Sequence, residues 1–120
     1  MKAVTNAGPL IALAKLGLVS LLARLYEIVL VPTTVFEEVV TRGLEIGEAD
    51  AYAVQLAVAR RELQVITEET SEPEAIEENA LLHSGELAAI RLARQERSDW
   101  LLLDDQLARE QAQQLGLNVK

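Results

Sequence analysis

Two adjacent aspartates, Asp104 and Asp105, are the first residues of this chain whose type and position could do chemistry. They follow an apolar run over residues 100–103, which predicts a strand buried on both faces. Ligands of an open parallel sheet bind outside the carboxyl ends of its strands, so an acidic pair there is well placed to hold a hard cation. Asp104 could instead cap the helix expected from Gln106 to Leu115. A cap accounts for only one of the two aspartates.

Three further oxygen-bearing side chains are expected at the same edge of the sheet. Asn6 follows the first predicted strand, Glu38 lies in the first turns after the second, and Glu86 lies in the first turn of the helix that leads into the fourth. A helix between parallel strands begins at their carboxyl edge, so these positions share that edge with the aspartates. Each also has a plainer interpretation. Asn6 could be a turn residue, and Glu38 could be a solvated helix residue. Glu86 could simply interact with the helix dipole, which stabilises a helix by about 0.3–1 kcal/mol.

Carboxylates gathered at one edge would repel one another unless a cation lay between them. Oxygen ligands without cysteine suit Mg²⁺ or Mn²⁺ better than zinc. The single histidine, His83, is more typical of a local hydrogen-bonding residue than of a catalytic one. Such ions lower the pKa of a bound water, orient a scissile phosphate and stabilise the leaving oxygen. The pattern therefore favours metal-assisted phosphodiester hydrolysis.

The elements that position these residues alternate along the chain. Strands are predicted over 2–5, 28–31, 63–67 and 100–103, with a fifth beginning at 117. Helices are predicted over 10–16, 18–26, 34–42, 47–61, 71–82, 85–97 (capped by Ser84) and 106–115. Thr34 with Glu37, and Ser71 with Glu74, match the capping box that begins a helix. This alternation predicts an α/β fold: a parallel sheet with helices on both faces.

The apolar residues of the first two helices are expected to face the core. In the first helix they follow helical spacing up to Leu16. In the second they are the leucines at positions 18, 21, 22 and 25.

Composition excludes several classes of protein. A chain of 120 residues forms one domain, and with 50% apolar but 3% aromatic residues its core must consist of Leu, Val, Ile and Ala. The absence of cysteine excludes disulfides and thiol chemistry. No apolar run approaches the roughly 18 residues of a membrane span, and the start lacks a signal peptide, so a cytoplasmic protein without a membrane partner is expected. The net charge of −8 argues against nonspecific nucleic-acid binding, although metal ions invert the local sign where acids gather.

Four segments together resemble PIN-domain proteins, most of all the prokaryotic branch related to VapC toxins of toxin–antitoxin pairs. They are residues 6–16, 31–39, 85–90 and 103–105 with Ala108 and Arg109. The order and spacing of the four are more specific than any one of them. The resemblance implies one PIN-like domain over residues 1–120, with a three-layer α/β/α fold and a parallel sheet of four to five strands in the order 3-2-1-4-5.

The same resemblance implies a Mg²⁺- or Mn²⁺-dependent endoribonuclease, with RNA as substrate, an antitoxin protein as partner and a homodimer as assembly. Carried over position by position, the implied metal ligands are Asn6, Glu38, Glu86 and Asp105. The implied catalytic residues are Glu38, Glu86, Asp104 and Asp105. Arg91 and Arg94, one turn apart, would contact RNA phosphate if they face the cleft, and otherwise belong to a solvated helix face.

Two departures from the family pattern leave alternatives open. Asn6 stands where the family has its first acid, which removes one negative charge and should lower metal affinity. The chain ends at Lys120, short of the usual C-terminal extension, and a dimer partner could cover the exposed sheet edge. Both departures favour a second hypothesis, a catalytically weakened PIN-like binding or scaffold module. A receiver-like phosphoacceptor would need its acidic pair after the first strand, whereas here the pair follows the fourth.

Overall fold

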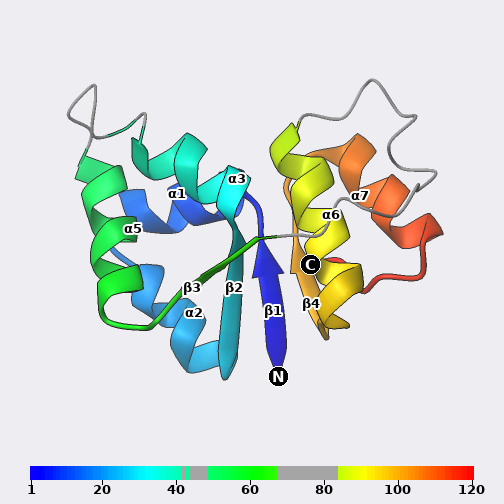
Figure 1. Cartoon of the computed structure of the whole chain (residues 1–120), viewed down its shortest axis with the longest axis horizontal. Coiled ribbons are helices and arrows are strands. Elements are labelled where there is room, and N and C mark those ends of the chain that lie inside the picture. Colours follow the sequence, from blue (N-terminus) through cyan, green and yellow to red (C-terminus); the bar gives the residue numbers. More distant parts are fainter. Residues whose placement is uncertain (42, 44–48, 68–83) are drawn as a thin grey trace.

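The computed structural model describes residues 1–41, 43, 49–67 and 84–120. Strands and helices alternate within these residues, as the sequence predicts (Figure 1). Their bounds are β1 (Lys2–Thr5), α1 (Ala7–Lys15), α2 (Val19–Leu25), β2 (Ile28–Pro32), α3 (Thr33–Phe36), the π-helical turn η1 (Glu37–Thr41), α5 (Ala49–Ala59), β3 (Gln64–Ile66), α6 (Ser84–Glu96), β4 (Trp100–Leu102) and α7 (Gln106–Gln114).

The sheet has the strand order β3-β2-β1-β4, and every pair of neighbouring strands is parallel. Ala3 of β1 pairs with Val29 of β2 on one side and with Trp100 of β4 on the other. Beyond β4, Val119 forms a single parallel bridge with Leu101, where the fifth strand was expected to begin. The predicted α/β class and the order 3-2-1-4 are confirmed.

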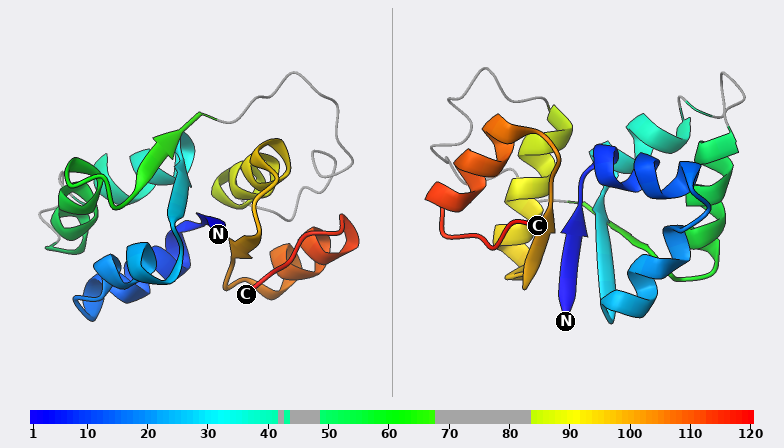
Figure 2. Two further views of the ribbon diagram at one scale, coloured as in Figure 1. Left: turned by 90° about the horizontal axis from the view of Figure 1, so that it is seen from below. Right: turned by 180° about the vertical axis from the view of Figure 1, so that it is seen from behind.

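Two apolar clusters cover the two faces of the sheet, because successive strand residues point to opposite sides. Ala3 and Val29 join a cluster with α1, α2 and α5. Val4 and Leu30 join a second cluster, with α6 and α7. The helices accordingly form two outer layers with the sheet between them, as seen from the front in Figure 1 and from below and behind in Figure 2.

The capping box predicted at Thr34 and Glu37 is wrong. The helix begins one residue earlier, with Pro32 of β2 in the N-cap position and no side-chain cap. Thr34 therefore lies inside α3, and Glu37 opens the π-helical turn η1 with its side chain exposed. Because the strand passes directly into the helix, the cap position falls on a strand residue instead of on a threonine.

The inward face predicted for the second helix is also wrong in most positions. Within α2 the buried residues are Val19 and Leu22, whereas Leu25 is 58% exposed. The other two expected core leucines, at positions 18 and 21, are exposed, as is Leu16 at the end of α1. A helix of seven residues buries only one narrow face against the core. The segment 18–25 therefore contains more apolar residues than that face can bury.

Two predicted features lie outside the described residues: the helix that was expected to begin at Ser71, and His83. Within the ranges that are described, no single helix is long and apolar enough to cross a membrane. Helices α1 and α2 pass that test only as a pair, bent by 115°.

Candidate functional site

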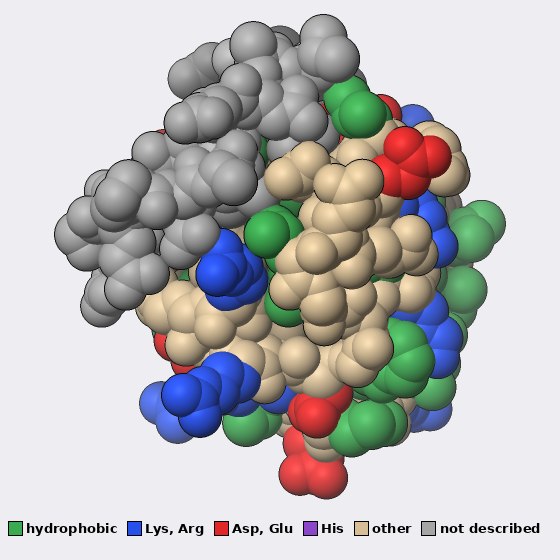
Figure 3. Space-filling model, turned by 90° about the vertical axis from the view of Figure 1, so that its right-hand side faces the viewer, with side chains coloured by type: hydrophobic (Ala, Val, Ile, Leu, Met, Phe, Trp, Pro, Cys, Tyr) green, Lys and Arg blue, Asp and Glu red, His purple; other side chains and the backbone are tan. Residues whose placement is uncertain are grey.

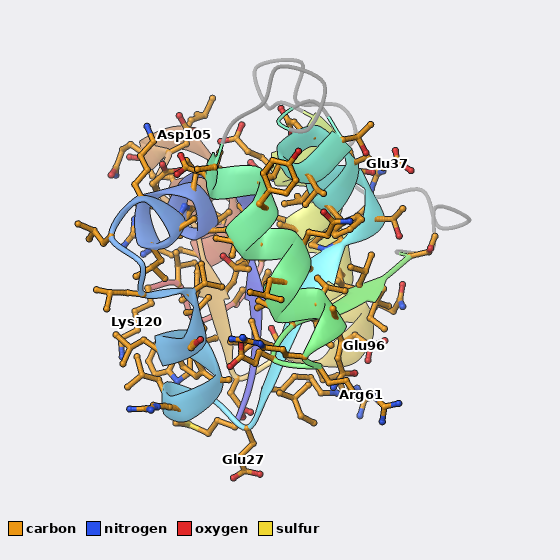
Figure 4. The ribbon with its side chains drawn as sticks, turned by 90° about the vertical axis from the view of Figure 1, so that its left-hand side faces the viewer. Glu27, Glu37, Arg61, Glu96, Asp105 and Lys120 are labelled. Carbon is orange, nitrogen blue, oxygen red and sulfur yellow. The ribbon has the colours of Figure 1, made fainter. Side chains whose placement is uncertain are left out.

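The carboxyl edge of the sheet brings together elements that are distant in the sequence. β1 lies between β2 and β4, so whatever follows β1 has the segments after β2 and after β4 as neighbours. The backbone N–H of Asn6 donates to the carbonyl of Leu102 at 3.1 Å, which joins the end of β1 to the end of β4. The two aspartates follow directly. Figure 4 shows Asp105 and Glu37 at this end of the molecule and Glu27 at the opposite end.

Asn6 is buried without a partner for its side chain. It occupies the N-cap position of α1 with 6% of its surface exposed, yet its amide makes no cap hydrogen bond. Its backbone is engaged, because the carbonyl accepts from the Thr5 hydroxyl at 3.0 Å. No other described residue bonds the side-chain amide. An N-cap asparagine normally bonds its own helix, and buried polar groups normally have partners. This amide is therefore available to a ligand.

The oxygens of Asn6 and Glu38 meet at the start of α6. An ideal Cβ placed on Gly85 would lie 2.9 Å from Glu38 Oε2 and 3.4 Å from Asn6 Oδ1. Both oxygens therefore occupy the small space beside the backbone of Gly85, next to Glu86 in the same helical turn. Glu38 is exposed and Glu86 is 5% exposed. The positive end of the α6 dipole partly offsets the negative charge gathered there.

Asp104 approaches the site from the other side of β1. An ideal Cβ on Gly8 would overlap the carboxylate group of Asp104. The carboxylate therefore lies directly against the first turn of α1, two residues after Asn6. Like Glu38, the Asp104 side chain makes no hydrogen bond or ion pair within the described part of the chain, and it is exposed.

Asp105 has a structural task. Its Oδ2 accepts a hydrogen bond of 2.9 Å from the backbone N–H of Ala108 and so caps α7. The sequence had offered Asp104 as the candidate cap; the structure assigns that place to its neighbour.

The donor set fits a hard divalent cation in type, but a complete cage is not assembled. Among residues 1–41, 43, 49–67 and 84–120, no three Asp, Glu, His or Cys side chains lie close enough to hold an ion. The oxygens present are carboxylates and one amide, the ligands that Mg²⁺ takes together with several waters.

The predicted contact of Arg91 and Arg94 with RNA stays a prediction. Both lie on α6, Arg91 half-buried and Arg94 exposed, and both already have interaction partners. Basic side chains on the face over α6 and α7 are dispersed among acidic and apolar ones (Figure 3), so the described side chains form no continuous basic patch on that face.

Gly8 and Gly85 are the site residues whose role the sequence did not indicate. Each removes a side chain where an acidic group from another element must approach a helix backbone. A glycine in the first turn of a helix is the available signal, but glycine there is also common for conformational reasons.

Comparisons with known proteins agree with this fold. A solved domain of a functionally unknown protein from Methanocaldococcus jannaschii DSM 2661 is similar in structure, with a TM-score of 0.59 and 19% sequence identity, over 99% of this chain and 89% of that one. The search of curated proteins found no match. A family model described as PIN domain (DUF3368) matches residues 2–120. The chain belongs to the PIN-domain family, whose members are generally nucleases.

Proposed function

We propose that this protein is an endoribonuclease that hydrolyses RNA phosphodiester bonds with Mg²⁺ or Mn²⁺ held at the carboxyl edge of its sheet. The observation that carries the proposal is the buried Asn6 amide, which has no hydrogen bond within the described residues and lies beside Glu38 Oε2 at the start of α6. Because the Asn6 amide makes no hydrogen bond with a described residue and its oxygen lies in the same small space as a carboxylate oxygen, it remains available to a ligand.

Each side chain has a distinct part in holding the ion. Asn6 would offer a neutral amide oxygen from the centre of the sheet edge, and the exposed Glu38 would offer a carboxylate oxygen from the side of β2. Glu86 adds a largely buried carboxylate from the first turn of α6, and an aspartate of the turn after β4 closes the opposite side. The bound ion supplies activation of the attacking water and stabilisation of the leaving oxygen.

We extend the proposal to a VapC-like toxin of the cytoplasm, held in check by an antitoxin protein and assembled as a homodimer. Its support is the resemblance of residues 6–16, 31–39 and 85–90 to that branch of the family. Co-expression with candidate antitoxins, read as rescue of arrested growth, tests this part separately from the chemistry. Growth unaffected by expression of an active nuclease would contradict the toxin role alone.

The nuclease proposal is tested by cleavage of a labelled single-stranded RNA with Mn²⁺, Mg²⁺ or EDTA. Glu38→Gln and Glu86→Gln are expected to lower the rate by about 100-fold or more, the scale of a lost electrostatic group in an active site. Glu37→Gln is the matched control, since Glu37 is the exposed neighbour of Glu38 and loses the same charge. A wild-type protein that cleaves no RNA with either metal overturns the proposal.

A second candidate, a PIN-like binding or scaffold module without catalysis, is favoured by two observations: an amide stands at the end of β1, and no three-acid group is assembled among the described residues. Calorimetric titration with Mn²⁺ separates the two. A nuclease site is expected to bind at sub-millimolar concentrations, whereas a relic binds no Mn²⁺ in that range and leaves RNA intact.

A further inference from the structure

The two aspartates after β4 are held differently. Asp105 turns its carboxylate toward its own helix, where Oδ2 accepts the 2.9 Å bond from Ala108. Asp104 turns its carboxylate across the sheet edge onto Gly8, and no described residue bonds it. One aspartate thus serves the helix α7, while the other points at the element that carries Asn6.

The approach of Asp104 to Gly8 is fixed by the backbone on both sides. The Asn6 N–H bonds Leu102 at 3.1 Å, which sets the end of β1 against the end of β4. Arg109 Nη1 donates to the carbonyl of Leu103 at 2.8 Å, which holds the residue just before Asp104. With both backbones held, Asp104 has room at this place only because Gly8 has no side chain.

Backbone conformation does not explain this glycine. Among the described residues the glycines with positive φ are Gly17 and Gly116, and Gly8 lies within the regular helix α1. An L-residue can adopt the helical backbone of Gly8, and alanine would be the better helix former there. Space for the Asp104 carboxylate is the remaining reason.

The place where Asp104 arrives is also where a ligand is indicated independently. Asn6, two residues before Gly8, is more than nine-tenths buried, and within the described chain its amide has no partner. Glu38 Oε2 and Asn6 Oδ1 lie 2.9 Å and 3.4 Å from the same ideal Cβ position on Gly85, and the Asp104 carboxylate lies against Gly8. Glu38 follows β2 and Asp104 follows β4, so the segments that carry the two carboxylates lie on either side of the segment that carries Asn6.

We infer that Asp104 is the aspartate of this turn that binds the metal, that Asp105 serves mainly as the cap of α7, and that Gly8 is a positioning residue that makes room for Asp104. The inference rests on the proposed metal-dependent nuclease. It reassigns the metal-binding role that family resemblance gives to Asp105.

The test compares wild type with Gly8→Ala, Asp104→Asn, Asp104→Ala, Asp105→Asn and Gly8→Ala/Asp104→Ala. Mn²⁺ affinity is measured by calorimetry and thermal unfolding without metal by circular dichroism. Gly8→Ala and Asp104→Asn are each expected to weaken Mn²⁺ binding about tenfold. Gly8→Ala should unfold without metal at the wild-type temperature or above, because alanine favours the helix. A smaller loss is expected for Asp105→Asn, since asparagine caps a helix as well as aspartate does.

The double variant separates positioning from general damage. If Gly8 acts by placing Asp104, then Gly8→Ala adds no further loss of Mn²⁺ affinity once Asp104 is alanine, so the two effects are not additive. Losses that add fully, or a greater loss in Asp105→Asn than in Asp104→Asn, overturn the inference. If wild type binds Mn²⁺ and cleaves RNA while Gly8→Ala and Asp104→Asn match it, only this inference fails. If wild type neither binds nor cleaves, the proposed function fails with it.

Discussion

Arg109 donates a hydrogen bond of 2.8 Å from Nη1 to the backbone carbonyl of Leu103, the residue immediately before the two aspartates. The same nitrogen donates to the carbonyl of Lys120, also at 2.8 Å. One side chain of α7 therefore ties the end of β4 to the segment that places Val119 beside Leu101. The geometry of the acidic turn thus depends on a basic side chain that is not among the proposed metal ligands.

Arg109→Met is expected to lower the free energy of unfolding by about 1–3 kcal/mol, because two hydrogen bonds from a charged donor are lost and the Leu103 carbonyl loses its partner. Urea denaturation measures the change. Arg24→Met, an exposed arginine of α2, is the matched control and should change stability by less than about 0.5 kcal/mol. Equal effects of the two substitutions would contradict the role given to Arg109.

Asn6→Asp restores an acid at the end of β1. Without metal this adds a buried negative charge beside Glu38, so the variant should unfold at a lower temperature than wild type. At one high Mn²⁺ concentration the order should reverse, because the added carboxylate lowers the dissociation constant of the variant. Stabilisation of the folded state by a ligand grows with concentration relative to that constant and reaches about 2.7 kcal/mol at 100 times its value. Thermal unfolding of wild type and variant, measured once in EDTA and once in Mn²⁺, tests both expectations. A loss of stability that Mn²⁺ does not recover would count against a metal at Asn6.

The cap of α7 gives a prediction about stability alone. Asp105→Ala removes the acceptor of the Ala108 N–H and should cost about 0.5–2 kcal/mol of unfolding free energy. Asp105→Asn keeps a capping oxygen and should cost much less. The comparison is made by chemical denaturation without metal. An asparagine variant as unstable as the alanine variant would show that charge, not capping, is what this side chain supplies.

The face of α2 can be mapped by truncation. Leu22→Ala removes a buried side chain from the cluster around β2 and should cost about 2–5 kcal/mol. Leu25→Ala removes the same atoms from an exposed position and should stay within about 0.5 kcal/mol of wild type. Unfolding by urea distinguishes them. Similar losses at both positions would mean that this helix packs as the sequence pattern alone predicts.

The fold was predictable because its signals are large and repeated. The apolar run at 100–103 and the alternation of strands with helices identified a parallel sheet, and the family resemblance put the first and fourth strands side by side. The placement of Asn6 and Glu38 on one edge followed from that topology, and the structure brings their oxygens together at Gly85.

The errors arose where the role of a single residue depends on the local path of the backbone, which the spacing of residues in the sequence does not reveal. Thr34 looked like a cap, but the direct passage from β2 into α3 moved the cap position to Pro32. Likewise, the sequence alone is compatible with either of two adjacent aspartates as the cap of the following helix. Only the path of the turn after β4 selects Asp105 for the cap and turns Asp104 onto Gly8.

The Asn6 amide, which bonds no described residue, has a consequence for directed evolution of thermal stability. Asn6 has 6% of its surface exposed and its amide bonds no described residue, so it contributes little to the stability of the fold, and natural proteins commonly retain such positions where activity requires them. Selection of variants for thermal endurance alone should accumulate compact apolar replacements at Asn6. The selected variants are expected to unfold at a higher temperature and to lose the proposed RNA cleavage, so selection for stability should be paired with an assay of that activity.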